Sequence, residues 1–181
     1  MPSDAVLYQA AALCLTYPDH DLYARLPLLR EAAPPLREFT DHAAVTPRAE
    51  LAEHYVRVFD SEERHSLRLG RWYDESDPCG GVSQARFEDS YRRHGLEFTG
   101  DEPPDFLPAV LEFAARTGDT GLLTGHRAGL ERLRSRLTGF GTPYASVLNA
   151  VCATLPTAYD RPWTDGCIRT TENGRRTTDN G

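Results

Sequence analysis

The stretch PRAELAEHYVRVFD, residues 47–60, has the clearest amphipathic pattern in this chain of 181 residues. At about 100° per residue, its apolar side chains fall within one arc of a helical wheel. They are Leu51, Tyr55, Val58 and Phe59. The charged side chains Glu53, Arg57 and Asp60 face the other way. Pro47 suits a first helical position, so the pattern predicts a helix that begins there and buries one face.

Segments with similar three- and four-residue spacing lie on both sides of this helix. They cover residues 3–16, a stretch that starts at 19 or 21, and residues 34–44, 61–69, 83–95, 105–116, 120–137 and 143–155. Ser3 is the expected cap of the first, and Gly95 the expected end of the segment 83–95. Pro27 should kink the second helix or delay its start. Because no strand pattern competes, the sequence predicts an all-α, single-domain helical bundle.

Periodicity stops near Pro156. The last segment, TAYDRPWTDGCIRTTENGRRTTDNG, is rich in Thr, Asp, Asn, Gly and Arg. Such a composition cannot bury enough apolar surface to fold. We therefore expect a helical domain over residues 1–156 and a disordered tail over residues 157–181.

Charge and targeting signals narrow the function classes. The net charge is −7, and all 20 basic residues are arginine. An acidic surface repels phosphate backbones, which argues against nucleic acid as the main partner. The amino terminus lacks the basic start and cleavage site of a signal peptide, and its apolar run is too short to span a bilayer. These features, and four cysteines without a C-x-x-C pair, predict a cytoplasmic protein that does not insert into membranes.

Catalytic signatures are missing from the sequence. It has no Gly-rich phosphate loop, no G-x-S-x-G, no H-E-x-x-H and no dinucleotide fingerprint. Its six histidines are scattered without the spacing of metal ligands. We therefore expect neither an enzyme nor a bound cofactor or metal.

A basic stripe follows the helix of residues 47–60. If residues 61–69 continue as a helix, Arg64, Arg68 and Arg71 lie at positions i, i+4 and i+7, beside Leu67 and Trp72. Two interpretations remain open. The stripe can be a solvated face paired with nearby acids, or it can contact acidic or carbonyl groups of a partner.

The stretch DEPPDFLPAVLEFAAR, residues 101–116, starts as a stiff turn. Pro103 and Pro104 restrict the preceding residues to extended conformations. Asp105 can then cap the helix by accepting from free amides of the first turn. Glu112 is expected on the surface, facing solvent or pairing with Arg116 four residues on, without a catalytic role.

Four motifs together resemble a known family. ELAEHYVRVFD, S-L-x-L, FEDSYRRHGLEF and EPPDFLPAVLEFAA occur in this order over residues 5–155. The combination resembles the nitrate reductase assembly chaperones, the NarJ or delta-subunit family of the TorD-like group. One departure is the loop DESDPCGG, residues 74–81, where family members usually carry an Arg-rich Gly-Asp loop.

The resemblance implies an all-helical, TorD-like chaperone that holds the catalytic subunit of respiratory nitrate reductase until its molybdenum cofactor is inserted. It implies binding to the amino-terminal segment of that subunit before membrane docking. The net charge favours a client segment with Arg or Lys. The predicted partner-binding residues are Tyr55, Asp60, Arg64, Arg68, Arg71, Pro104, Asp105 and Phe106.

Other functions stay open from the sequence. The chain could serve another molybdoenzyme, or be a permanent helical subunit or a small helical enzyme. We expect a monomer or a weak dimer.

Overall fold

The computed structural model describes residues 3–61, 63–72, 84–97 and 102–156. Within these ranges the chain forms only helices, together with one isolated antiparallel bridge. The elements are α1 (Asp4–Cys14), α2 (His20–Ala32), η1 (Pro34–Leu36), α3 (Arg37–Val45), α4 (Arg48–Tyr55), η2 (Val56–Asp60), η3 (Glu63–His65), η4 (Leu69–Trp72), α5 (Gln84–Arg93), α6 (Leu107–Thr117), α7 (Gly121–Gly125), α8 (Arg127–Phe140) and α9 (Tyr144–Thr154). The predicted all-α architecture is confirmed. The predicted tail, residues 157–181, lies outside the described residues.

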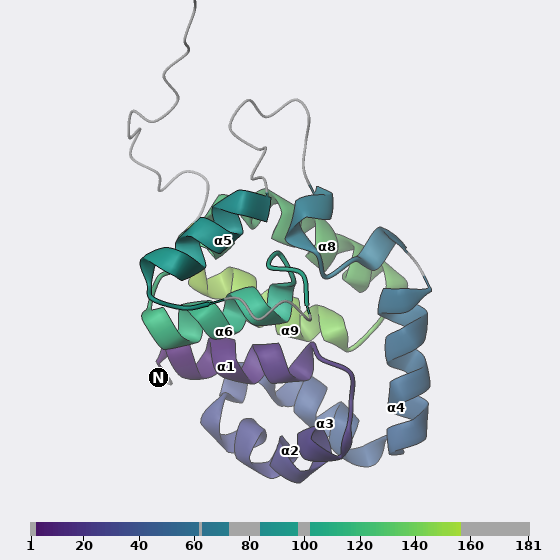
Figure 1. Cartoon of the computed structure of the whole chain (residues 1–181). Coiled ribbons are helices and arrows are strands. Elements are labelled where there is room, and N and C mark those ends of the chain that lie inside the picture. Colours follow the sequence, from purple (N-terminus) through teal and green to yellow (C-terminus); the bar gives the residue numbers. More distant parts are fainter. Residues whose placement is uncertain (1–2, 62, 73–83, 98–101, 157–181) are drawn as a thin grey trace, which may run out of the picture.

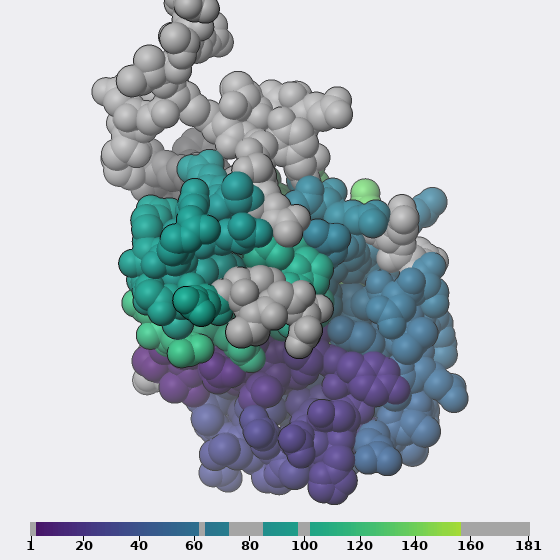
Figure 2. Space-filling model, in the orientation of Figure 1, coloured from purple at the N-terminus to yellow at the C-terminus, as the bar shows by residue number. Residues whose placement is uncertain are grey.

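Helix α1 lies at the centre of the bundle. It packs against α6 on one side, α2 on the other and α9 behind (Figure 1). Three consecutive alanines, residues 10–12, are fully or almost fully buried, and these small side chains let the neighbouring backbones approach closely. In the space-filling view the purple surface of α1 crosses the middle of the molecule, between α5 and the pair α2 and α3 (Figure 2).

The helix ends follow the sequence signals in part. The Asp19 carboxylate caps α2 by accepting from the Leu22 amide at 2.9 Å. Gly95, just after α5, has a φ of 69°, as its predicted role requires. Ser3 precedes α1 but makes no side-chain cap. Pro27 lies inside α2, which begins at His20 without the delayed start that was one of the two expectations.

Helix α4 confirms the opening prediction. Leu51, Tyr55, Val58 and Phe59 are buried, whereas Glu53, Arg57 and Asp60 are exposed. The last of these residues belong to η2, a wider turn in which the Ser61 amide donates to the Val56 carbonyl, five residues back.

Two expected helices are interrupted. The predicted helix over residues 61–69 is wrong, because η3 and η4 are short turns and residues 67–69 pair with residues 105–107 instead. Arg64, Arg68 and Arg71 therefore do not form a helical stripe. The segment 120–137 divides into α7 and α8 at His126, whose ring Nδ1 lies 2.8 Å from the Leu122 carbonyl oxygen.

In the described part of the chain, no helix is both long and apolar enough to span a membrane.

Candidate partner-binding site

The turn before α6 is tied to the segment after α4 by a short antiparallel pairing. The Leu69 amide donates to the Asp105 carbonyl at 2.9 Å, and the Leu107 amide donates to the Leu67 carbonyl at 2.8 Å. Arg68 and Phe106 form the bridge between them. The two segments are thereby held in one register.

The Asp105 carboxylate strengthens this pairing. One oxygen accepts from Arg68 Nε at 3.1 Å, and the other accepts from the Gly70 amide at 3.1 Å. The Asp105 side chain is only 8% exposed, and the Arg68 side chain is 43% exposed. A Cβ atom on Gly70 would lie 2.8 Å from Asp105 Oδ2, so only glycine leaves room for this contact. We call Arg68, Gly70 and Asp105 the clasp.

The predicted cap of α6 by Asp105 is therefore wrong. Phe106 occupies the cap position and makes no side-chain cap. The Asp105 carboxylate is already bound by Arg68 and Gly70, and the first amide of α6, Leu107, bonds to Leu67. Pro108, the next residue, has no amide hydrogen to satisfy.

Glu112 is exposed, as expected, and so is Arg116, whereas Asp105 is buried. Among the described residues, no ion pair joins Glu112 to Arg116. Glu112 thus faces solvent, which is one of its two predicted positions.

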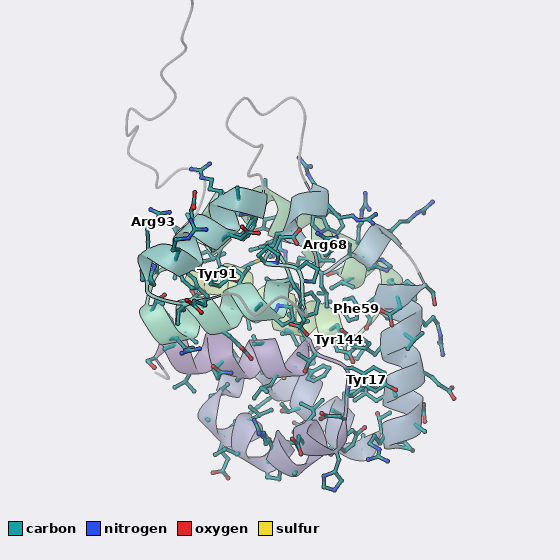
Figure 3. The ribbon with its side chains drawn as sticks, in the orientation of Figure 1. Tyr17, Phe59, Arg68, Tyr91, Arg93 and Tyr144 are labelled. Carbon is teal, nitrogen blue, oxygen red and sulfur yellow. The ribbon has the colours of Figure 1, made fainter. Side chains whose placement is uncertain are left out.

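Tyr91 of α5 fixes the same turn from the other side. Its hydroxyl donates to the Pro104 carbonyl at 3.2 Å, and its ring packs edge-on against Phe113 of α6 at 4.9 Å (Figure 3). Burial raises the pKa of Tyr91, and the Glu112 and Asp105 charges raise it further, so the phenol stays protonated as a donor.

Trp72, at the end of η4, anchors the paired segment of residues 67–69 to α8. Its indole nitrogen donates to the Ser66 carbonyl at 2.8 Å, and the Arg136 guanidinium lies over its ring at 4.9 Å from the centroid. A Cβ atom on Gly129 would lie 2.6 Å from Trp72 Cβ. The absence of a side chain at Gly129 therefore lets Trp72 pack directly against the backbone of α8.

A cluster of aromatic rings lies where α4, α9 and the end of α1 meet. Tyr144 stands at its centre, with the rings of Phe39 and Phe59 both 4.9 Å away and that of Tyr55 at 5.9 Å. Figure 3 shows Phe59, Tyr144 and Tyr17 gathered there. The Tyr144 hydroxyl is buried without a hydrogen-bond partner, whereas the Tyr55 hydroxyl donates to the Leu15 carbonyl at 3.2 Å. Tyr55 is thus a core residue at the edge of the aromatic cluster, where its ring meets the exposed Tyr17.

Two acidic residues affect the ionisation of the Tyr55 hydroxyl. Burial raises the pKa of Tyr55, and the charges of Asp60 and then Glu102 raise it further. Both carboxylates are exposed. Glu102 directly precedes Pro103 and Pro104 in the turn before α6.

The structure brings six of the eight predicted site residues into two places. Arg68, Pro104, Asp105 and Phe106 meet at the clasp, where Pro104 and Asp105 are buried. Tyr55 and Asp60 lie one turn apart on α4 and η2. Arg64 and Arg71 are exposed on η3 and η4, and the Arg71 amide donates to the Arg68 carbonyl at 3.1 Å. Their contact with a partner stays a prediction.

Sequence reasoning missed several residues that build the site. They are Tyr17, Gly70, Tyr91, Glu102 and Gly129. Each acts through a neighbour that is distant along the chain. Only the two glycines carried a signal, because each stands within an otherwise periodic or apolar segment where a larger residue would be expected.

The described residues contain no group of three or more His, Cys, Asp or Glu that could hold a metal ion. Cys14 and Cys152 are free and buried, and burial raises the pKa of their thiols to about 12 and about 11. Both therefore stay protonated and unreactive near neutral pH.

Known proteins resemble the chain over most of its length. Nitrate reductase-like protein NarX of Mycobacterium tuberculosis is 32% identical over an alignment of 174 positions, and the match covers 88% of this chain. The chain spans about a quarter, 26%, of that relative. The probable nitrate reductase molybdenum cofactor assembly chaperone NarJ of Bacillus subtilis is 27% identical, and the match covers 91% of this chain and 96% of that protein.

A solved structure has the same fold. A putative redox enzyme maturation protein from Archaeoglobus fulgidus matches with a TM-score of 0.66, over 82% of this chain and 91% of that one. Its sequence identity is 21%, so this likeness concerns the fold alone. The family pattern described as nitrate reductase delta subunit matches residues 26–150, well over half of the sequence. The chain therefore belongs to the nitrate reductase delta subunit family.

Proposed function

We propose that this chain is an assembly chaperone for a respiratory nitrate reductase. It binds the amino-terminal segment of the catalytic subunit and holds the cofactor-free enzyme for molybdenum cofactor insertion, before the enzyme docks at the membrane. One observation carries the proposal. The Bacillus relative named as a probable nitrate reductase molybdenum cofactor assembly chaperone matches 91% of this chain over 96% of its own length, so the likeness is not confined to a shared module.

The geometry supports peptide binding. The clasp and Tyr91 hold the turn before α6 in place, and an exposed tyrosine, Tyr17, lies beside the buried aromatic cluster. An amphipathic helix or extended peptide needs such an apolar surface with polar groups at its edge. A turn that is already held in place also lowers the entropy lost on binding.

The charge pattern favours a basic client segment. Asp60 and Glu102 are exposed, and the whole chain carries a net charge of −7. Opposite charges steer the encounter and set the orientation of the bound segment. We propose that the chain has no catalytic activity of its own, because its strongly perturbed phenols and thiols are buried in the core.

Calorimetry with a synthetic peptide tests the proposal. The peptide would copy about the first 15 residues of the catalytic subunit encoded with this chain, and a scrambled peptide of the same composition is the control. The chaperone role predicts saturable binding of the first peptide and at least tenfold weaker binding of the second. Equal binding of both would contradict the role.

Two alternatives give different results. A permanent subunit would copurify in fixed ratio with active, cofactor-loaded reductase, which a chaperone leaves. A chaperone for another molybdoenzyme would bind the amino-terminal peptide of that enzyme better than the nitrate reductase peptide.

A further inference from the structure

One stripe of side chains joins helix α5 to the bundle. Phe87 is fully buried, and its ring lies 5.0 Å from that of His126, at the junction of α7 and α8. One turn on, the ring of Tyr91 packs edge-on against Phe113 of α6 (Figure 3). His94, just after the helix, continues the stripe, because positions i, i+4 and i+7 share one face of a helix.

Both ring nitrogens of His94 face oxygen atoms. Nδ1 lies 3.0 Å from the Ser90 carbonyl oxygen, one turn back on α5. Nε2 lies 3.7 Å from Asp119 Oδ2, in the turn between α6 and α7. Because a carbonyl oxygen only accepts, Nδ1 carries a proton in this contact. A neutral ring then turns the Nε2 lone pair toward a carboxylate, whereas an imidazolium ring presents an N–H group to it.

The two partners are held in this geometry from outside. The other oxygen of Asp119, Oδ1, accepts from the Gly121 amide at 2.7 Å, which fixes the carboxylate. The ring of Phe113 meets that of His94 edge-on at 5.0 Å, which fixes the imidazole. Of these groups on neighbouring elements, Phe113 is uncharged, so Asp119 supplies the charge that the ring meets.

Other charged groups act on α5 in different ways. Arg93 precedes His94, but its Nε donates to the Asp89 carbonyl at 3.3 Å, and the Asp89 carboxylate pairs with Arg92. At the other end of the helix, burial lowers the pKa of His126. Protonation of His126 therefore needs a lower pH than usual and weakens the folded state. It acts in the opposite direction to protonation of His94.

We propose that His94 and Asp119 form a pH-sensitive latch that ties the end of α5 to the turn between α6 and α7. The latch closes when the His94 ring is protonated and opens when the ring is neutral. Histidine is the side chain that ordinarily changes its charge between pH 5 and 8. Tyr91, one turn earlier, holds the Pro104 carbonyl at 3.2 Å, so the latch also affects how firmly α5 holds the turn before α6. Any effect on the client rests on the proposed function, whereas the latch itself is a property of the free protein.

Native-state hydrogen exchange at pH 6 and pH 8 tests the latch. The probes are the amides of His94, Gly95 and Leu96, which donate to the Tyr91 and Arg92 carbonyls. The side chains of the pair are 34% and 42% exposed, so its contribution is modest. After division by the intrinsic exchange rate at each pH, protection should be roughly two- to fivefold higher at pH 6. Equal protection at both pH values, or lower protection at pH 6, would overturn the latch.

Asp119→Asn gives the matched comparison. Its Oδ1 can still accept from Gly121, but an NH2 group replaces the oxygen that faces His94. This donor suits the neutral ring and repels the imidazolium, so protection at pH 6 should no longer exceed that at pH 8. Asp21→Asn removes the same charge from an exposed position on α2 and should behave like the wild type. An increase at pH 6 that survives in Asp119→Asn would overturn the latch.

Nitrogen-15 NMR of the His94 ring tests the same geometry without a variant. At pH 8 the neutral ring should carry its proton on Nδ1, because the Ser90 carbonyl requires a donor there. A proton on Nε2 would place an N–H group against Asp119 in the neutral state as well. That result would overturn the latch.

Client binding separates the latch from the chaperone role. With the 15-residue client peptide, the ratio of the affinities at pH 6 and pH 8 should be about twofold larger for the wild type and Asp21→Asn than for Asp119→Asn. Equal ratios would overturn the effect on the client but not the latch. Equal binding of native and scrambled peptides by the wild type would overturn the chaperone role and leave the exchange result unchanged.

Discussion

Removing the Asp105 carboxylate should cost far more stability than removing a helix cap. In the structure this carboxylate accepts from the Gly70 amide and from Arg68 Nε, both at 3.1 Å, and it is almost fully buried. A hydrogen bond to a charged, buried group contributes about 1.5–3 kcal/mol. The ion pair with Arg68 adds less than about 1 kcal/mol, because that guanidinium is 43% exposed. Asp105→Ala should therefore lower the free energy of unfolding by about 2–4 kcal/mol.

The control is a residue that does cap a helix. Asp19 accepts from the Leu22 amide at 2.9 Å, so Asp19→Ala should cost only about 1 kcal/mol. Urea unfolding followed by circular dichroism gives both values, provided that the slopes agree.

A double-mutant cycle with Gly70 makes the test specific. In the wild type, Gly70→Ala places a methyl group 2.8 Å from Asp105 Oδ2 and should cost about 1–3 kcal/mol. After Asp105→Ala the methyl group has room, so the same change should cost little. If Asp105→Ala costs no more than Asp19→Ala, and the effects of Asp105→Ala and Gly70→Ala simply add, the clasp does not exist as described.

Gly129, the Tyr144 hydroxyl and two buried histidines can be tested one contact at a time. Gly129→Ala should destabilise the protein by about 1–3 kcal/mol and change tryptophan fluorescence, because its Cβ would lie 2.6 Å from Trp72 Cβ. Unchanged fluorescence and stability would contradict the close packing of Trp72 against Gly129. Tyr144→Phe should leave the free energy of unfolding unchanged or up to about 1 kcal/mol higher, since the hydroxyl has no partner; a clear loss would reveal one. Burial lowers the pKa of His54 and His126, so the folded state binds fewer protons and stability should fall as the pH drops below about 6.5. Replacing His126 by Gln should flatten this decrease in unfolding experiments between pH 8 and 5.

The sequence predicted the parts of the fold that depend on local periodicity. The buried face of α4 and the glycine after α5 were identified correctly, because each rests on residues within a few positions of one another. The all-α class follows in the same way, from repeated three- and four-residue spacing without any competing strand pattern.

The clasp could not be predicted from local signals. Arg68 and Asp105 are 37 residues apart, and each looks like part of a helix when read alone. Asp105 stands where a cap would stand, but its carboxylate finds better donors across the pairing than in the first turn of α6. The register of two short extended segments depends on contacts that a helical wheel does not contain.

The aromatic cluster around Tyr144 could likewise be predicted only in part from local periodicity. Periodicity places Tyr55 and Phe59 on the buried face of their helix, which the structure confirms. It gives no indication that the ring of Tyr17, in the loop after α1, meets that of Tyr55 with 5.7 Å between the centroids. Nor does it indicate that the charge of Glu102 raises the pKa of Tyr55. Which residues share a surface depends on how the helices pack, and packing is set by the whole chain.

The same variants can test whether the clasp contributes to binding of the client peptide. Because the clasp holds the turn that carries the predicted partner-binding residues Pro104 and Phe106, Asp105→Ala should weaken binding of the client peptide by several-fold. Asp19→Ala removes the cap of α2 without touching the clasp and should weaken binding less. Equal affinities for the two variants would limit Asp105 to a structural role.

The chaperone role is tested most directly by comparing two forms of the reductase catalytic subunit. Size-exclusion chromatography of this chain mixed with the cofactor-free subunit, and separately with the cofactor-loaded subunit, measures complex formation. The chaperone role predicts a stoichiometric complex with the cofactor-free form and separate peaks with the loaded form. Equal association with both forms, or with neither, would contradict it.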